Sequence, residues 1–273
     1  MLFRSLHVKT VKGKGYPPAE QEPDRFHGVS PFRVEDGAPL SAGGAATFSG
    51  VFGQTMCELA RDRGEVCAIT AAMQSGTGLD EFARQYPRRF FDVGIAEEHA
   101  AAMAAGMAKQ RALPVFAVYS TFLQRSYDML LHDVGIQGLH VVFAVDRAGL
   151  VGEDGETHHG VFDVAYLSSV PGMRILCPAN FAELRAMLRH AVLELTGPAA
   201  VRYPRGGEGA LTALCGAEGA SVVRQGADIT LIAYGTMINE ALSAADLLEE
   251  RGMSAQVLKL NSIAPLDMDT IAL

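Results

Sequence analysis

Residues 91–108 read FDVGIAEEHAAAMAAGMA, a short strand that passes directly into a helix. The strand ends at about Val93, Gly94 permits a turn, and Glu97 begins a helix built almost entirely of small apolar residues. A short apolar strand followed at once by a helix is the repeating unit of a parallel sheet that is covered by helices. We therefore expect further units of this kind on both sides.

The same alternation continues outward from this unit. Further strands are expected at residues 65–70, 114–120, 140–146, 174–178 and 199–204, with helices at 49–62, 122–134 and 182–195. These strands are continuously apolar, which is typical of a parallel sheet buried on both faces. The sequence thus predicts an α/β fold in which residues 47–208 form a doubly wound parallel sheet.

The segments on either side of this region differ from it in composition and periodicity. Residues 1–46 are rich in glycine, proline and charge and show no sustained period, so we interpret them as the tail of another domain and a linker. Residues 209–273 begin with a loop, and then a strand, a helix and a strand follow. So short a segment buries little surface by itself, and we expect it to be the truncated start of a second α/β domain.

Composition favours a small-molecule site. The 273 residues include 23 Lys+Arg and 31 Asp+Glu, a net charge of −8, which disfavours nucleic acid or an anionic membrane as the main partner. The four cysteines show no C-x-x-C spacing, so neither a zinc site nor a disulfide framework is indicated. No apolar run approaches ~18 residues, and we expect a cytoplasmic protein without a membrane segment.

Glu97 is the first candidate site residue, and two interpretations are open. An acid in the first helical turn is often a favourable partner of the helix dipole. The small residues that follow would also let the helix pack tightly, so that an acid on its inner face is withdrawn from water, as general acid–base groups often are.

The segment after the strand at 114–120 carries aromatic side chains and one cation. Tyr119, Phe122 and Tyr127 could form a platform for a planar ring, with Arg125 close enough to bind an anion. A core helix with one exposed arginine explains the same spacing, and the sequence does not separate the two.

Two further loops follow strands and are too polar to be core. DRAGLVGEDGETHHGVFD begins at Asp146 and includes Arg147, Asp154 and His158; a substrate loop with acid–base histidines is favoured over a solvated loop or a metal site. AVRYPRGGEG contains two arginines around a proline turn, Arg202 and Arg205, which suit a phosphate but could be mere surface charge.

The common nucleotide, hydrolase and zincin motifs are missing from the sequence: there is no GxGxxG, P-loop, GxSxG or HExxH. Instead GEDGETHHG resembles the G-x-D-G-x-T-H-Q loop of thiamine-diphosphate enzymes of the transketolase superfamily. IAEEH, YSTFLQRSYDMLLHDV, DRAGLVGEDG and AVRYPRG resemble the branch of that superfamily that forms 1-deoxy-D-xylulose 5-phosphate. The resemblance covers nearly the whole chain, and HVKTVKGKGYPPAE resembles the end of that branch's first domain.

This resemblance implies a transferase with the pyrimidine-binding fold and thiamine diphosphate as cofactor. It would condense pyruvate with glyceraldehyde 3-phosphate, with loss of carbon dioxide through the cofactor's ylid, for isoprenoid, thiamine and pyridoxal biosynthesis. The implied roles are catalysis for Glu97, Arg125, Asp154 and His158, cofactor binding for Glu97, Tyr119 and Phe122, and phosphate binding for Arg147 and Arg205. The sequence departs from the family pattern at Glu98 and His159, where glutamine is usual.

In this superfamily Mg²⁺ and the cofactor's diphosphate sit on an N-terminal domain with a GDG motif, which the chain lacks. No metal ligands are therefore expected here, and we expect either a homodimer or a partner chain that supplies that domain. The chain would be a fragment or one half of a split enzyme. The alternatives are another member of the superfamily, such as transketolase or a pyruvate dehydrogenase β-like subunit, and a non-catalytic binding module.

Overall fold

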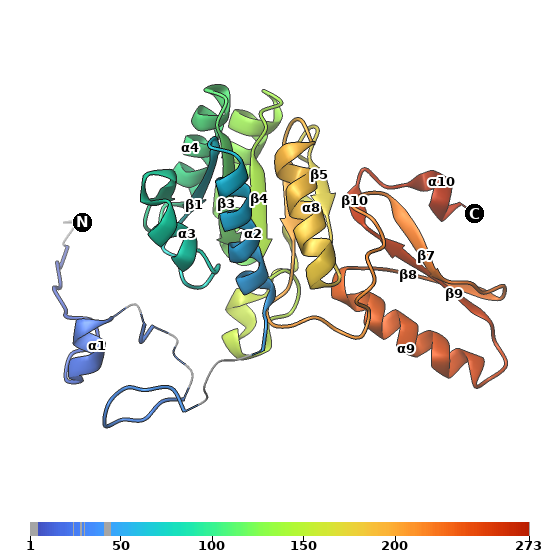
Figure 1. The fold of residues 1–273 in the computed structure, drawn as a ribbon, viewed down its shortest axis with the longest axis horizontal. Coiled ribbons are helices and arrows are strands. Elements are labelled where there is room, and N and C mark those ends of the chain that lie inside the picture. The colour runs from blue at the N-terminus through green and yellow to red at the C-terminus, as the bar shows by residue number, and fades with distance from the viewer. Residues whose placement is uncertain (1–4, 24, 28, 30, 41–44, 273) are drawn as a thin grey trace, which may run out of the picture. The chain divides into compact units, whose positions relative to one another are not determined.

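The computed structural model describes residues 5–23, 25–27, 29, 31–40 and 45–272 (Figure 1). Contacts divide the chain into two units, Met1–Ala45 and Ala46–Leu273. The first unit contains the helix α1 (Pro17–Gln21) and a small cluster of the rings of Tyr16, Phe26 and Phe32. The remaining parts of the expected tail and linker, at 1–4, 24, 28, 30 and 41–44, lie outside the described residues.

The second unit contains a seven-stranded sheet in the order β10-β5-β6-β4-β3-β1-β2. Its strands are β1 (Val66–Thr70), β2 (Phe90–Asp92), β3 (Leu113–Tyr119), β4 (Val142–Asp146), β5 (Arg174–Leu176), β6 (Ala199–Arg202) and β10 (Ser262–Ala264). All neighbouring pairs run parallel except β10 with β5. The predicted α/β fold with a parallel sheet is confirmed.

Helices cover both faces of this sheet. They are α2 (Phe48–Asp62), α3 (Asp80–Gln85), α4 (Glu97–Lys109), α5 (Ser120–Leu123), α6 (Tyr127–Met129), α7 (Asp163–Leu167) and α8 (Phe181–Leu193). One apolar core lies between the sheet and α2, α3 and α8, and the other lies between the sheet and α4, α5 and α7. Successive strand residues point to opposite faces, so one strand contributes to both cores, as Val115 and Phe116 of β3 do.

The helix expected across residues 122–134 is not continuous. It is divided into the end of α5, a 3₁₀ turn η2 (Gln124–Ser126), the short α6 and a π-helical turn η3 (Leu130–Gly135). Other short turns are η1 (Pro87–Arg89), η4 (Gly152–Asp154), η5 (Glu156–His158) and η6 (Gly235–Met237). Such irregular turns re-aim the side chains that follow a strand, and they concentrate at functional sites.

The C-terminal segment forms a second, three-stranded sheet of order β7-β9-β8. Its elements are β7 (Ala220–Arg224), β8 (Ile229–Tyr234), α9 (Ile238–Glu249), β9 (Ala255–Leu260) and α10 (Met268–Ile271). β7 and β10 were not predicted from the sequence, and β10 adds one antiparallel edge strand to the parallel sheet that was predicted. A strand of three residues has no periodicity to recognise, and β10 forms because β5 offers it an unpaired edge.

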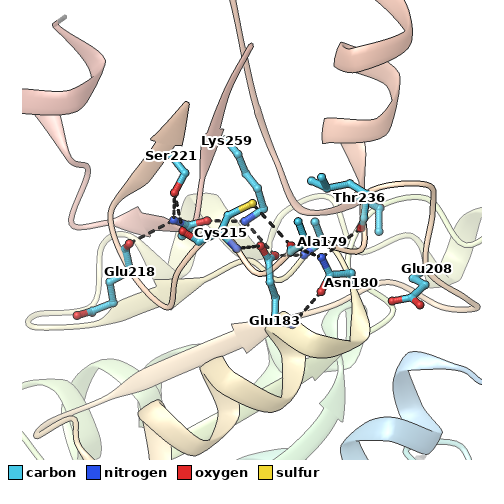
Figure 2. Close-up of polar contacts among 12 residues, drawn as sticks. Ala179, Asn180, Glu183, Glu208, Cys215, Glu218, Ser221, Thr236 and Lys259 are labelled. Carbon is cyan, nitrogen blue, oxygen red and sulfur yellow. Dashed lines mark hydrogen bonds and ion pairs between the residues drawn. The ribbon is translucent and has the colours of Figure 1, made fainter. Parts of the chain in front are cut away.

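A buried polar network joins this segment to α8 (Figure 2). Lys259 on β9 and Glu183 on α8 are both 0% exposed, and the Nζ to Oε2 distance is 3.0 Å. Lys259 also donates to Asn261 Oδ1 at 2.6 Å, and the backbone N–H of Cys177 donates to the Asn261 carbonyl at 2.8 Å. Asn180 caps α8 by accepting from the Glu183 N–H at 2.9 Å.

Candidate active site

The polar residues predicted from sequence lie at the carboxyl ends of four strands of the large sheet. Glu97 follows β2, Tyr119 ends β3, Arg147 follows β4 and Arg205 follows β6. Parallel strands place their carboxyl ends on one edge, which is where open α/β sheets bind ligands.

Glu97 is the first residue of α4 and is 2% exposed. The turn before it is held by Asp92, whose Oδ1 accepts from the N–H groups of Ala72 at 2.8 Å and Gly94 at 2.9 Å. Gly94 has a φ of +71°, a conformation that glycine adopts without strain. Arg125 Nη1 lies 3.2 Å from Glu97 Oε2, so the buried carboxylate has a cationic partner.

The inner face of α4 is lined by alanines at 100, 101, 104 and 105, all at most 5% exposed. Their small side chains bring the helix axis close to the sheet, and this close packing is what withdraws Glu97 from water. Glu97 is therefore withdrawn from water, as one of the two interpretations requires, whereas the neighbouring Glu98 is exposed.

Aromatic rings form a wall on the far side of Arg125, the partner of Glu97. Tyr119 and Phe122 stack with ring centroids 5.9 Å apart and planes at 20°, and the His158 ring meets Phe122 edge-on at 5.5 Å. The guanidinium of Arg125 lies 5.9 Å from the Phe122 centroid, and that of Arg147 lies 3.9 Å from the Tyr119 centroid. Burial raises the pKa of the Tyr119 hydroxyl, so the ring stays neutral at ordinary pH.

Gly76 keeps this wall in place. A Cβ at this position would collide with the Tyr119 hydroxyl, so glycine is required by the close approach of the ring. Sequence analysis did not identify Gly76, since nothing in the local pattern shows that a ring 43 positions later contacts it.

The loop that carries Asp154 and His158 is closed at its base by Gly149 and Gly160, whose N–H and C=O groups bond reciprocally at 2.8 Å. His159 Nδ1 accepts from the Val151 N–H at 3.2 Å, which spans the loop. His158 Nδ1 lies 3.0 Å from Thr157 Oγ1, which leaves its Nε2 as the ring nitrogen to meet a ligand.

A cavity of about 520 Å³ opens beside this loop. Its lining includes Ser49 at the start of α2, Gly76, Arg147 and Arg205. Arg205 Nε lies 3.3 Å from Asp154 Oδ2, and Arg147 Nε lies 3.9 Å from the same oxygen. Arg147 Nε and Asp154 Oδ2 are buried and make no hydrogen bond to any described residue; Asp154 Oδ2 is engaged in these ion pairs, and Arg147 Nε can donate to a polar ligand.

Asp146 holds the guanidinium of Arg147 in position. It is 0% exposed, accepts from Ser49 Oγ at 2.7 Å and lies 3.1 Å from Arg147 Nη1. Burial raises the pKa of Asp146, an effect that the neighbouring arginine opposes. Arg147 Nη1 also donates to the Gly76 carbonyl at 2.6 Å, and the backbone at Arg147 has a φ of +57°.

All eight predicted site residues form one chain of contacts. It runs from Glu97 to Arg125, Phe122, Tyr119, Arg147, Asp154 and Arg205, and His158 branches from Phe122. The two arginines of the AVRYPRG segment separate: Arg202 is 8% exposed and pairs with the buried Asp163 at 2.8 Å and 3.1 Å, while Arg205 lines the cavity. Sequence analysis missed Ser49 and Asp92, whose roles depend on partners from other strands.

Among the residues that the structure describes, no three or more His, Cys, Asp or Glu side chains are grouped so that they could hold a metal ion. None of the helices that the structure describes is both long and apolar enough to cross a membrane.

Family models match most of the chain. The model described as "Transketolase, pyrimidine binding domain" matches residues 45–207, and "Transketolase, C-terminal domain" matches residues 218–273. Among solved structures, a split gene transketolase titled "inactive beta4 tetramer" has a TM-score of 0.73 at 28% identity, covering 84% of this chain and 76% of that one. Transketolase from Pichia stipitis has a TM-score of 0.72 at 19% identity, covering 90% of this chain and 40% of that one, a likeness of fold.

Curated relatives named 1-deoxy-D-xylulose-5-phosphate synthase are similar over almost the whole chain. The protein from Desulforudis audaxviator is 53% identical over 269 residues, and that from Pelotomaculum thermopropionicum is 51% identical over 271 residues. These alignments cover 96% and 97% of this chain and 42% of each relative, so the chain spans less than half the length of the relatives it matches. Since the pyrimidine-binding model matches well over half of the chain, the chain belongs to the transketolase pyrimidine-binding domain family.

Proposed function

We propose that this chain carries the pyrimidine-binding half of the active site of a thiamine-diphosphate-dependent 1-deoxy-D-xylulose-5-phosphate synthase. That enzyme condenses pyruvate with glyceraldehyde 3-phosphate and releases carbon dioxide. The observation that carries the proposal is the buried Glu97 carboxylate at the start of α4, connected through Arg125 to the Tyr119–Phe122 ring stack. The relatives of this name, at about half identity along the chain, support the choice of substrates.

The residues present fit the cofactor. A flat aminopyrimidine needs an aromatic surface and a carboxylate acceptor, and the ring stack and Glu97 provide both. When bound, thiamine diphosphate would supply a nucleophilic ylid carbon and a thiazolium ring that accepts the electrons released by decarboxylation of a 2-keto acid. Phe122 and Tyr119 would hold the ring, and Glu97 would accept a hydrogen bond from a ring nitrogen and keep its proton in place.

The other polar residues would act on the substrates. His158 presents Nε2 beside Phe122, where it can exchange a proton with a hydroxyl or carbonyl oxygen. Arg125 lies half-exposed at the mouth of the site and can order a carboxylate or hydroxyl. Asp154 holds Arg205 at the cavity and can accept a hydroxyl proton.

The phosphate of the aldehyde would bind in the 520 Å³ cavity. Arg205 provides a guanidinium there, and Ser49 lies at the start of the 15-residue helix α2, whose N-terminal end favours negative charge. Arg147 is committed to Asp146, Gly76 and Tyr119, so it would orient the site and leave Nε for the phosphate.

The domain assignment follows from the same proposal. Residues 1–46 would be the tail of a diphosphate-binding domain and a linker, residues 47–208 the pyrimidine-binding domain and residues 209–273 the start of a C-terminal domain. A diphosphate-binding domain, from the same longer polypeptide or from a partner chain, would supply the ligands of Mg²⁺ and of the diphosphate. A solved transketolase that is encoded by split genes supports the two-chain possibility.

The proposal is tested by supplying this chain with a separate diphosphate-binding domain. The chain is mixed with the N-terminal part of the Desulforudis audaxviator relative, thiamine diphosphate and Mg²⁺, and carbon dioxide release is followed with pyruvate and glyceraldehyde 3-phosphate. We expect release that requires both substrates. Glu97→Gln should lower kcat by roughly 10²–10⁴, the usual contribution of a positioned acid–base group.

Glu98→Gln is the matched control, because Glu98 is the next residue of the same helix and is exposed. It should stay within twofold of the unaltered chain. Equal turnover by the Glu97→Gln variant would refute the role of Glu97, and turnover of a ketose phosphate without pyruvate would indicate a transketolase instead.

Arg205→Ala should raise the KM for glyceraldehyde 3-phosphate about tenfold or more and leave the KM for pyruvate unchanged, since a charge-assisted hydrogen bond contributes about 1.5–3 kcal/mol. Arg189→Ala, which removes a half-exposed arginine of α8 that lies 3.8 Å from Asp62, is the control for loss of one charge. An effect confined to pyruvate would contradict the phosphate role of Arg205.

A further inference from the structure

A second cavity, of about 370 Å³, lies where β1 and β2 begin, at the opposite end of these strands from Glu97. Its lining includes the arginines 88, 89 and 111 and the apolar residues Phe91, Met107 and Ala112. The helix α4 runs from one site to the other, since Glu97 is its first residue and Met107 lies near its end, roughly 15 Å further along the axis. The volume falls within the range of small-molecule sites.

The arginines of this cavity carry charge that the described residues do not neutralise. Arg89 is a structural residue: its Nη1 donates to the carbonyls of Arg63 at 3.1 Å and Gly64 at 3.2 Å. The side chains of Arg88 and Arg111 make no hydrogen bond or ion pair with any residue that the structure describes. The one carboxylate in the lining, Glu65, is paired with Arg63 at 3.4 Å. The cavity therefore has an excess of positive charge.

Arg111 lines the cavity with its backbone in a strained conformation. It is the second residue after α4 and has a φ of +68°, the left-handed conformation in which glycine is the usual residue after a helix. Glycine would satisfy the backbone with less strain, so the helix ending does not account for an arginine here. A conformation of this kind, held next to a cavity, points to a role for the side chain.

Apart from Gln110, the rest of the lining is apolar or only weakly polar. Cys67 Sγ lies 3.8 Å from Met107 Sδ, and burial raises the pKa of the Cys67 thiol to about 11, so it remains a neutral, weakly polar group near pH 7. Phe91 and Met107 offer a flat hydrocarbon and thioether surface beside the two arginines. The chemistry selects a ligand with an anionic group and an apolar ring.

We propose that this cavity is a second binding site, for a small organic phosphate whose phosphate is bound by Arg88 and Arg111 and whose apolar body packs on Phe91 and Met107. Guanidinium groups bind phosphate with paired hydrogen bonds, which favours phosphate over a neutral ligand. The proposal does not depend on the activity proposed above, because no residue of the two sites is shared.

Calorimetry of the full 273-residue chain with phenyl phosphate tests this site. We expect a dissociation constant below about 1 mM. Inorganic phosphate should bind at least tenfold more weakly because it lacks the ring, and benzyl alcohol should not bind measurably.

Four variants locate the ligand. Arg88→Ala and Arg111→Gly should each weaken phenyl phosphate binding at least tenfold, and Arg111→Gly should melt at or above the temperature of the unaltered chain, because glycine relieves the left-handed strain. Arg251→Ala removes an exposed charge elsewhere and should change nothing. Arg205→Ala removes the phosphate ligand proposed for the other cavity, so phenyl phosphate binding that persists in this variant and is lost in Arg88→Ala and Arg111→Gly belongs to this site.

The proposal is overturned if phenyl phosphate does not bind at 10 mM, or if Arg88→Ala and Arg111→Gly leave its affinity unchanged. It is equally overturned if Arg205→Ala abolishes binding, which would assign the ligand to the cavity beside α2. If inorganic phosphate binds as tightly as phenyl phosphate, the apolar residues do not contribute to binding, and that part of the proposal is wrong.

Discussion

The Glu97 carboxylate and its arginine differ sharply in their surroundings. The side chain of Glu97 is 3% exposed and that of Arg125 is 52% exposed. A buried carboxylate is stable when it keeps a charged or hydrogen-bonding partner, and a half-exposed arginine can leave without itself being buried. Glu97 can therefore exchange Arg125 for a ligand nitrogen at little cost, which is the property that the proposed site requires.

The cysteines give a residue-scale prediction about ionisation. Burial raises the pKa of Cys67 to about 11 and that of Cys177 to about 12, from an ordinary value of 9. Folding thus favours the protonated thiols, and this contribution to stability is complete below about pH 9 and is lost as the pH rises toward 12. At pH 8 we expect both thiols to resist an aromatic disulfide reagent in the native chain.

Mass spectrometry of the labelled chain checks this expectation. Cys57 and Cys215, which are partly exposed, should react first, and all four cysteines should react in denaturant. Labelling of Cys177 in the native chain as fast as Cys57 would contradict the burial described here.

At the scale of an element, α4 is the helix on which the proposed site depends. Its inner alanines have no room for a larger side chain, because they meet the sheet directly. The helix begins at Glu97, so any displacement of the helix from the sheet moves the carboxylate as well.

Ala101→Leu should therefore lower the free energy of unfolding by about 1–3 kcal/mol through overpacking and reduce turnover in the complemented enzyme. Ala102→Leu is the matched control, since Ala102 is the next residue and is exposed, and it should stay within about 0.5 kcal/mol. Urea denaturation of both variants provides the measurement. Equal stability of the two would show that α4 does not pack as tightly as described.

At the scale of the whole Ala46–Leu273 unit, the C-terminal segment is joined to the large sheet in two ways. The strand β10 pairs with β5, and the network of Figure 2 buries Lys259 against Glu183. The carboxylate of Glu183 also accepts from the N–H groups of Ala179 at 2.8 Å and Cys215 at 3.2 Å, so one side chain contacts three segments of the chain. The sequence predicts that residues 209–273 bury little surface by themselves. These contacts bury part of the segment against the rest of the unit.

Lys259→Met should destabilise this unit by about 3–5 kcal/mol, because it leaves the Glu183 carboxylate buried without its countercharge. The double variant Glu183→Gln, Lys259→Met should recover much of the loss, since no charge is then buried. Lys109→Met, at an exposed position, is the control. Thermal unfolding measures all three, and a Lys259→Met variant as stable as the unaltered chain would contradict the role of the ion pair.

Local pattern in the sequence was sufficient for the alternation of strands and helices and for the loops that carry the polar residues, whereas the choice of eight candidates among them rested on the resemblance to a known family. The reason is geometric: parallel strands bring the residues that follow them to one edge, so residues that come directly after apolar strands must lie near one another. Glu97, Tyr119 and Arg147 come together in this way although they are distant in the chain.

Tertiary packing decided what no local pattern contains. Local sequence does not distinguish Arg202 from Arg205. In the folded chain Arg202 forms an ion pair with Asp163, whereas Arg205 lines the cavity. The pairing of Lys259 with Glu183 and the gathering of three arginines where β1 and β2 begin likewise depend on segments that meet only in the folded chain. Periodicity reports which face of an element is apolar, whereas the partner of a charge is set by whatever packs against that face.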